Sequence, residues 1–235
     1  MIEPYFYSNV NQHWSIRSSA IDTITIHCAV GLVNSNSIAR YLDVMTDDSS
    51  ANYCIGKDGD ITCMIPEKYR SWCSSNTAND DRAITIEVAS ETSSPYRVPT
   101  LAMASLIDLL VDICSRHDMR LKWSWYANER RNHVGGCNMT VHRDFAVKSC
   151  PGDFLYDNMQ AIVNTVNRRL STLEITRFNS LDSIPAGYRA FISDLVDAGV
   201  IKGKNDGSLD LSLDMIRCLI FCDRMIDDYY NTKEF

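Results

Sequence analysis

Two stretches of the chain alternate apolar and polar residues with a period of two, which is typical of β-strands. Residues 20–28 and 82–89 share this pattern, and β-branched residues fill most of both segments. Residues 52–57 and 60–65 are predicted as shorter strands joined by a hairpin, because an Asp-Gly pair between them accommodates positive φ. These patterns predict a β-sheet in the first part of the chain.

Apolar residues recur at helical spacing in residues 37–43, 101–117 and 154–170. The third segment carries one apolar stripe, formed by Leu155, Met159, Ile162, Val163, Val166 and Leu170. Asp153, which follows a Pro-Gly pair, is the expected N-cap of this helix. Strands intermixed with helices predict an α/β domain in which helices flank a central sheet, and we place its end near Leu170.

The remaining residues form a different kind of segment. Residues 171–180 are polar and without periodicity, so we interpret them as a linker. Residues 181–235 predict a small, mostly helical module, with an amphipathic helix up to Ala198 and a second helix from about Leu213. A core of about 60 residues is marginal on its own. We therefore expect the module to dock on the first domain, residues 1–170, or on a second copy of itself.

The composition is that of a folded, mildly acidic protein. Of 235 residues, 45% are hydrophobic and 23% are charged, and the formal net charge is −7. These values exclude a disordered or collagen-like chain. No basic run exceeds two residues, which argues against a nucleic-acid partner.

No segment is apolar over the length that a membrane span requires. The longest apolar stretch, residues 101–114, is interrupted by two aspartates, whereas a span needs about 20 apolar residues. No secretory signal is visible at the N-terminus. We expect synthesis in a bacterial cytoplasm without membrane insertion. A target outside the membrane would then require a release partner.

The nine cysteines do not form a disulfide framework, because their number is odd and no C-x-x-C pair occurs. Most of them are expected to be small buried apolar residues in a reducing compartment, and at most one or two to take part in chemistry. Among five histidines, His142 precedes Cys150 by eight positions, and His27 closes a predicted strand. Spacing alone leaves open whether these residues bind a soft metal or are structural.

Five ordered blocks give these residues a context. They are Thr25-Ile26-His27, Tyr53 within Ser50 to Ile55, Trp72, Ala83 to Val88, and His142-Arg143-Asp144 followed by Lys148 to Gly152. In this order the blocks resemble the type 2 zinc N-acetylmuramoyl-L-alanine amidases, a family that includes phage endolysins and peptidoglycan recognition proteins. The resemblance covers roughly residues 20–170, and it is most similar to endolysins of phages that infect clostridia. It implies a mixed central β-sheet flanked by helices.

The resemblance also implies a set of site residues. His27, His142 and Cys150 would be the zinc ligands, leaving one coordination position for water. Zinc-activated water would cleave the amide between N-acetylmuramic acid and L-alanine in bacterial peptidoglycan. Lys148 would stabilise the oxyanion, since it lies two residues before Cys150 and would face the same site in an extended segment.

Glu87 is the candidate general base, because a carboxylate inside an apolar strand is costly unless it is paired or functional. The alternative is an ion pair, for example with Arg82 or Arg143. Tyr53 matches a family tyrosine near the metal and could instead act as the base, bind substrate or be an ordinary strand aromatic. Trp72 is the candidate wall of the substrate groove, or a packed aromatic.

Two positions depart from the family pattern. Asn52 stands where many relatives have a histidine before the strand tyrosine, and Cys73 stands where many have a histidine after the tryptophan. Neither position is a ligand, so both departures concern substrate preference. The segment from Tyr188 to Asp228 resembles the helix–turn–helix of S-layer-homology-like modules, which implies binding to a wall polymer or self-association.

Three functions compete on this basis. The first is a peptidoglycan-cleaving zinc amidase of the endolysin type, which would be antimicrobial and phage- or bacterium-encoded. The second is a non-catalytic peptidoglycan recognition module, although such relatives typically lose the cysteine ligand, which is present here as Cys150. The third is a different zinc hydrolase, or a protein whose histidines and cysteines are structural.

Overall fold

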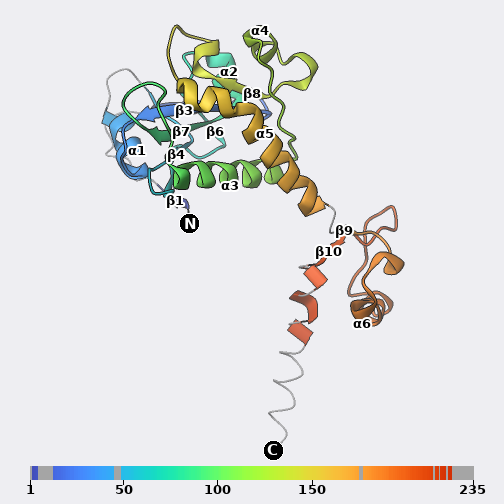
Figure 1. The fold of residues 1–235 in the computed structure, drawn as a ribbon. Coiled ribbons are helices and arrows are strands. Elements are labelled where there is room, and N and C mark those ends of the chain that lie inside the picture. The colour runs from blue at the N-terminus through green and yellow to red at the C-terminus, as the bar shows by residue number, and fades with distance from the viewer. Residues whose placement is uncertain are drawn as a thin grey trace, which may run out of the picture. The chain divides into compact units, whose positions relative to one another are not determined.

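The computed structural model describes residues 2–4, 13–44, 49–174 and 177–213, together with 215–216, 218–220 and 222–223. The chain divides into two compact units, Met1–Leu170 and Ser171–Phe235. Each unit has a core of its own. Figure 1 shows the ribbon of both units.

The first unit is built on a six-stranded mixed sheet with the order β1-β5-β4-β7-β3-β8. The strands are β1 (Ile2–Pro4), β3 (Thr23–Val30), β4 (Tyr53–Ile55), β5 (Ile61–Cys63), β7 (Ala83–Ser90) and β8 (Met139–Val141). All neighbouring pairs are parallel except β4 and β5, which form the predicted hairpin. The expected α/β fold with a mixed central sheet is therefore confirmed.

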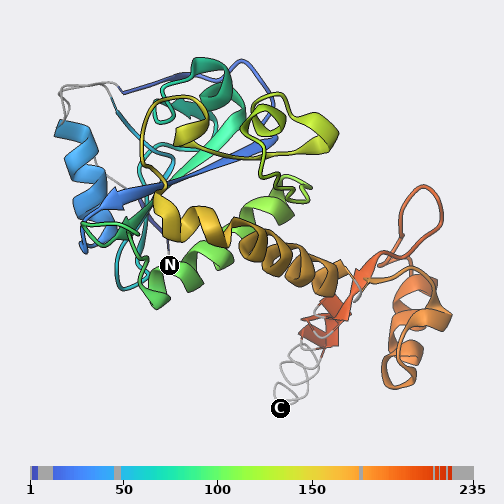
Figure 2. The same cartoon turned by 45° about the horizontal axis from the view of Figure 1, so that its top comes forward.

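Two long helices cover one face of this sheet. They are α3 (Thr100–Arg116) and α5 (Gly152–Glu174), and Figure 1 and Figure 2 show both on the same side of β3 and β7. Every second residue of the two central strands points into the core beneath them, and fully buried members of this set are Ile24, Ile26, Ile84, Ile86 and Val88. The period of two in the sequence thus reports a sheet face packed against helices.

The opposite face of the sheet has fewer apolar residues and carries the polar ones. Helix α1 (Ser35–Val44) packs there through Ile38 and Ala39. Helix α2 (Thr77–Arg82) adds Asn79, whose side-chain amide donates to Thr25 Oγ1 at 2.9 Å. A separate pair of strands, β2 (Trp14–Ile16) and β6 (Tyr69–Ser71), runs antiparallel beside this region. This face is where the site is built.

Helix α5 differs from its expected limits. It extends to Glu174, so the first four residues of the expected linker are helical. No proline or glycine interrupts residues 171–174, and the last turns of the helix continue past the buried Leu170. At the other end Asp153 lies inside the first turn, not at the cap.

The strands that carry His27 and Glu87 also run beyond the predicted segments, β3 to Val30 and β7 to Ser90. The two polar side chains therefore lie within strands, not at their ends. Two short helical segments follow in the chain, α4 (Ala127–Arg131) and the 3₁₀ turn η1 (Val134–Gly136), and a further 3₁₀ turn η2 (His142–Asp144) comes directly after β8.

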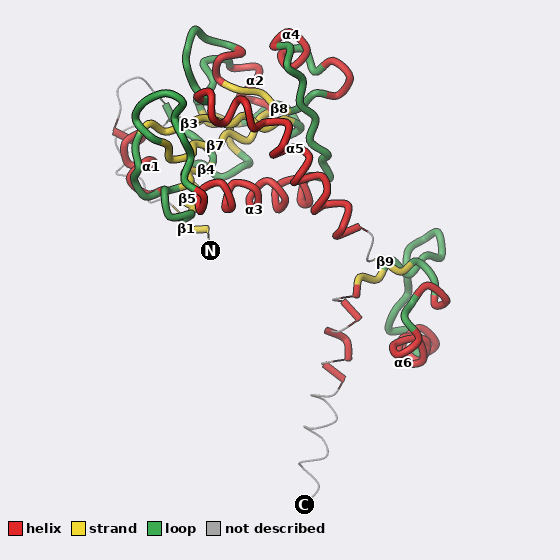
Figure 3. The backbone as a smooth tube through the Cα atoms, in the orientation of Figure 1, coloured by secondary structure: helices red, strands yellow, loops and turns green. Residues whose placement is uncertain are grey.

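The second unit combines helical segments with one short pair of strands. It contains the 3₁₀ turn η3 (Leu181–Ser183), α6 (Ala186–Asp197) and an unpredicted antiparallel pair, β9 (Arg177–Phe178) and β10 (Leu211–Ser212). Figure 3 shows α6 and β9 of this unit. The second expected helix, from about Leu213, lies partly outside the described residues; the described positions from 213 to 223 are helical. Among the described helices none is long and apolar enough to cross a membrane.

Candidate metal centre

His27 reaches the site because of its parity in β3. Its neighbours Ile26 and Cys28 point toward the helices α3 and α5, so the imidazole points to the opposite face, where it is fully buried. In the parallel pairing of β3 with β7, His27 is aligned with Glu87. The sheet therefore places an imidazole and a carboxylate side by side.

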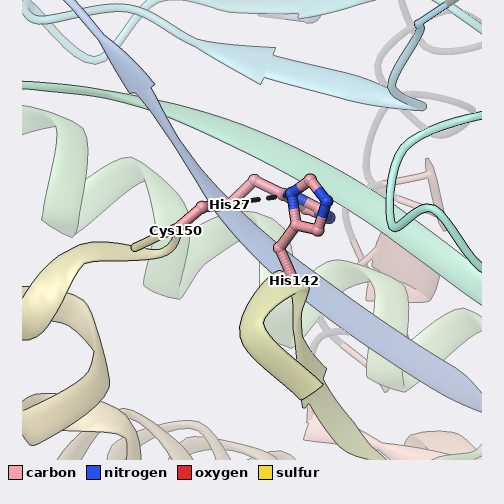
Figure 4. A group of neighbouring side chains, drawn as sticks. All are labelled: His27, His142 and Cys150. Carbon is pink, nitrogen blue, oxygen red and sulfur yellow. Dashed lines mark hydrogen bonds between the residues drawn. The ribbon is translucent and has the colours of Figure 1, made fainter. Parts of the chain in front are cut away.

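His142 arrives from the other side of β3. Strand β8 pairs with β3 in parallel and aligns Val141 with Ile26, so the next residue, His142, emerges beside His27. The two rings meet edge to face with centroids 5.0 Å apart (Figure 4). Because strand and register fix both backbones, this meeting does not depend on a flexible loop.

Cys150 completes the group from the segment that leads into α5. Its Sγ lies 3.5 Å from His27 Nδ1, the contact dashed in Figure 4. The backbone N–H of Cys28 donates to the same sulfur at 3.4 Å, and the N–H of Arg143 donates to the Cys150 carbonyl at 3.1 Å. These bonds hold the thiol toward the two imidazoles.

The three side chains fit a metal ion. One nitrogen from each histidine and the Cys150 sulfur all lie within 4.8 Å of one another. Ligands about 2.0 and 2.3 Å from a tetrahedral zinc are separated by roughly 3.5 Å, which is the distance seen between His27 Nδ1 and Cys150 Sγ. His27 Nε2 is buried with no hydrogen-bond partner among the described residues. Neutral imidazole nitrogens and a thiolate sulfur are donors that suit a soft or borderline cation.

The two imidazoles are held in the form that binds metal. Burial lowers the pKa of His27 well below its ordinary value, and the neighbouring His142 lowers it further. Burial also lowers the pKa of His142, with a smaller contribution from the Lys148 ammonium. Both rings are therefore neutral near pH 7, as a metal ligand must be.

A buried ion pair fixes the turn that carries His142, and sequence reasoning missed it. Arg130 and Asp144 are both buried, and the guanidinium donates two hydrogen bonds to the Asp144 carboxylate. The same carboxylate accepts from the Val141 N–H at 3.1 Å, and the Arg130 guanidinium stacks over Trp123 at 4.2 Å. The adjacent acidic residue in the His142-Arg143-Asp144 block was the available signal.

Ser75 is a second partner that the sequence did not reveal. Its hydroxyl lies 3.1 Å from His142 Nε2, which leaves the other ring nitrogen for a metal. Ser75 has a positive φ of 61°, a conformation that a serine rarely adopts. The loop is held by Asp80, whose carboxylate accepts from the N–H groups of Cys73 and Ser74.

Glu87 lies beside the group without a cationic partner. Its Oε1 is 3.8 Å from His27 Nδ1 and 3.7 Å from Cys73 Sγ, and its Oε2 is buried with no hydrogen bond to a described residue. Burial raises its pKa to about 8. The alternative of an ion pair with Arg82 or Arg143 is not observed, because Arg82 binds Asp22 and Arg143 binds Asp153.

A polar pocket of about 290 Å³ opens in front of His142. Lys148 and Trp72 both line it, together with Cys73 and Ser75. The Trp72 indole N–H donates to Ser15 Oγ at 3.3 Å, which fixes the ring in the wall. The structure thus brings His27, His142, Cys150 and Glu87 together and places Lys148 and Trp72 at the adjoining pocket.

Tyr53 is not brought to this cluster. In the pairing of β4 with β7 it is aligned with Ile86, whereas Cys54 is aligned with Glu87. The Tyr53 ring therefore lies on the α3 side of the sheet, 6% exposed, and its hydroxyl donates to Glu67 Oε1 at 2.7 Å. The expectation that Tyr53 contacts substrate or the reacting water is wrong in this structure.

The two departures from the family pattern have different surroundings. Asn52 is fully buried and bonds backbone groups, accepting from the Thr85 N–H and donating to the Ile65 carbonyl. Its role is to hold strands together. Cys73, in contrast, contacts Glu87 and so belongs to the site.

Comparison with known proteins identifies the family of the chain. The family model Amidase_2, described as N-acetylmuramoyl-L-alanine amidase, matches residues 17–153. A search of curated protein sequences finds no significant match.

Solved structures share the fold at low sequence identity. A mutant endolysin from Bacillus subtilis superposes with a TM-score of 0.52 at 17% identity, covering 71% of this chain and 98% of that one. The endolysin amidase LysCS from Clostridium intestinale gives 0.51 at 18% identity, covering 70% and 95%. The PlyG catalytic domain gives 0.54 at 14% identity, covering 72% and 95%. Since the family model spans more than half of the sequence, the chain belongs to the Amidase_2 family of N-acetylmuramoyl-L-alanine amidases.

Proposed function

We propose that residues 1–170 form a zinc-dependent peptidoglycan hydrolase of the endolysin type. The bond cleaved is the amide between N-acetylmuramic acid and L-alanine. One observation carries the proposal: two imidazoles and a thiol converge within 4.8 Å in an amidase-family chain. A buried carboxylate and a polar pocket adjoin that group.

His27, His142 and Cys150 would hold the zinc ion. When bound, zinc supplies a Lewis acid that polarises the scissile carbonyl and acidifies a water molecule. The chain orients these ligands through Ser75 at His142 and through the Cys28 N–H at Cys150. With three protein ligands, the ion would keep one position open for water or substrate.

Glu87 is the residue that we assign as general base. It lies against the metal group, and burial raises its pKa to about 8, which supports a role in proton transfer. A nearby cation favours the ionised form and brings this pKa down toward neutrality, where a base is most effective. Glu87 would accept the proton of the attacking water and return it to the amine nitrogen of L-alanine. Tyr53 is unsuited to this role because its phenol lies on the other face of the sheet.

Lys148 and Trp72 would act on the substrate from the pocket. The Lys148 side chain lines the cavity beside His142, so its ammonium is available to the oxyanion that develops on the carbonyl oxygen. Trp72 offers a fixed aromatic wall to the glycan or peptide. Neither side chain would have to leave its present position in the pocket to contact the substrate.

Residues 181–235, which belong to the second unit, are proposed to bind a wall polymer or a second copy of the chain. Phage or bacterial origin and release by a pore-forming partner belong to the same proposal. The alternative, a recognition module without catalysis, is less favoured because Cys150 retains its place beside both histidines.

Digestion of purified Gram-positive cell wall tests the function. We expect new L-alanine amino termini without new reducing sugar ends, and we expect a zinc chelator to abolish them. Cys150→Ser supplies the matched variant, since it removes the thiolate while keeping the side-chain shape. Tight wall binding without either product would overturn the enzyme and support the recognition module.

A further inference from the structure

Cys73 and two residues of the site form a second group of atoms that can act as metal ligands. The Cys73 sulfur, a Glu87 oxygen and a His27 nitrogen all lie within 4.8 Å of one another. This set shares His27 with the first group but replaces His142 and Cys150. It therefore lies next to the first metal position and partly overlaps it.

The distances fit an ion between Cys73 and Glu87. Cys73 Sγ lies 3.7 Å from Glu87 Oε1, close to the roughly 3.5 Å expected for sulfur and oxygen ligands of one tetrahedral zinc ion. Oε1 in turn lies 3.8 Å from His27 Nδ1. The Cys73 backbone is fixed because its N–H donates to Asp80 Oδ2 at 3.0 Å.

An unpartnered polar atom lies at the same place. In the described part of the chain, few buried side-chain nitrogen or oxygen atoms have no hydrogen-bond partner, and Glu87 Oε2 is among them. A buried polar atom without a partner normally signals a missing water, ion or functional contact. The thiol of Cys73 is only a weak donor and leaves Oε2 unsatisfied.

We propose that Cys73, Glu87 and His27 form a second, weaker position for a soft metal ion such as zinc or cadmium, and that an ion there inhibits the enzyme. A ring nitrogen has one lone pair, so the two positions compete for His27 Nδ1. With the first position filled, the second keeps Cys73 and Glu87 and binds more weakly. A metal on Glu87 engages the carboxylate that otherwise accepts a proton. The inhibition, unlike the binding, rests on the proposed function.

Metal stoichiometry tests the binding directly. In equilibrium dialysis of the full chain against zinc, wild type should bind one ion tightly and a second ion roughly 100-fold more weakly. Cys73→Ser should lose only the weak ion. Cys63→Ser is the matched control, since that thiol is half-buried on β5 and packs against the core on the α3 side. It should keep both ions.

Cobalt or cadmium absorption identifies the ligands. Cys150→Ser should still bind one ion and retain a sulfur-to-metal charge-transfer band, because the ion moves to His27, Cys73 and Glu87. The double variant Cys73→Ser/Cys150→Ser should lose this band. Circular dichroism of each variant verifies that the fold is retained, and Cys73→Ala provides a second deletion of the same thiol.

Wall hydrolysis tests the inhibition, with each variant compared with its own rate at one equivalent of zinc. Excess zinc should reduce the wild-type rate at least about 10-fold and leave the relative rate of Cys73→Ser unchanged, while magnesium should affect neither. A single ion per wild-type chain, or a weak ion that survives in Cys73→Ser, overturns the proposal. If the weak ion depends on Cys73 but no hydrolysis occurs, the metal position stands and the proposed function fails.

Discussion

Two glutamates of the first unit show how position decides the chemistry of one residue type. Glu67 accepts hydrogen bonds from Arg116, His117 and Tyr53, and these contacts outweigh burial and lower its pKa to about 2. Glu87 is buried without a cation, and its pKa rises to about 8. The first carboxylate is a structural anion, whereas the second can exchange a proton near neutral pH.

Replacing Glu87 with glutamine separates proton transfer from metal binding. We expect the rate of wall hydrolysis to fall roughly 10²- to 10⁴-fold, the usual contribution of a general base. The tightly bound ion should remain, since Glu87 is not one of its ligands. Kinetics and metal analysis on the same sample check both statements. A variant with near wild-type rate would remove Glu87 from the mechanism.

Ser75 offers a matched pair of substitutions. Ser75→Ala and Ser75→Gly both delete the hydroxyl at His142 Nε2, and we expect each to weaken metal affinity by about 10-fold or more. Only glycine relieves the positive φ of 61°, so Ser75→Gly should unfold at a higher denaturant concentration than Ser75→Ala. Metal competition and urea unfolding measure the two effects separately. Unchanged affinity in both variants would show that the hydroxyl does not position the ring.

At the scale of elements, the site depends on three neighbouring strands and on the two short helical segments, η2 and α4, that hold His142. Strands β7, β3 and β8 carry Glu87, His27 and the approach to His142 in adjacent positions. The 3₁₀ turn η2 then redirects the chain, held by Asp144 and by Arg130 of α4. Strand pairing thus sets the distance between the donors, and the buried ion pair sets the direction of His142.

Breaking that ion pair should destabilise the fold strongly. Arg130→Met leaves the Asp144 carboxylate buried without its cation. We expect this change to lower the free energy of unfolding by about 3–5 kcal/mol. Adding Asp144→Asn removes the uncompensated charge and should restore part of this loss. Urea unfolding of the single and double variants measures the difference. Additive losses would show that the pair is not coupled.

At the scale of the whole molecule, stability depends on two separate cores and on one acid-sensitive hydrogen-bond network. The first core spans the sheet and the helices α3 and α5, and the second lies within residues 171–235. The Glu67 network links Tyr53 of β4 to the end of α3 through Arg116. Acid resistance of the first unit therefore depends on contacts that are not part of the site.

The pH dependence follows from the sign of the Glu67 shift. Its pKa is about 2 in the folded protein and about 4.3 when unfolded, so the folded state binds this proton less readily. The stabilisation is complete above about pH 4.3 and is lost as the pH falls through 2. Glu67→Gln should lower stability at pH 7 and flatten the dependence below pH 5. Equal slopes for both proteins in urea unfolding would contradict this assignment.

Truncation tests the division into units. Because α5 continues past Leu170, we expect a fragment ending at Glu174 to keep the first core intact. Its activity on small muropeptides should survive, whereas its activity on intact walls should fall if the second unit provides targeting. Thermal unfolding of the fragment serves as the control. Loss of both activities in a folded fragment would make residues 175–235 part of the enzyme.

The sequence by itself determined the types of donor and the face on which several of them lie. The alternation in β3 and β7 places His27 and Glu87 on the face opposite the apolar residues of the same strands. The polar pair and the apolar set were therefore predictable. The ordered blocks indicated His142, Cys150, Lys148 and Trp72. Helical periodicity likewise predicted α3 and most of α5, because burial of one face imposes the pattern locally.

Tertiary structure alone decided which elements meet. Tyr53 could not be assigned to a face until the register of β4 against β7 aligned it with Ile86. The contact of Cys73 with Glu87 and that of Ser75 with His142 join residues far apart in the chain. Periodicity relates residues within one element, whereas these contacts depend on how separate elements pack, and a single sequence carries no local signal of that packing.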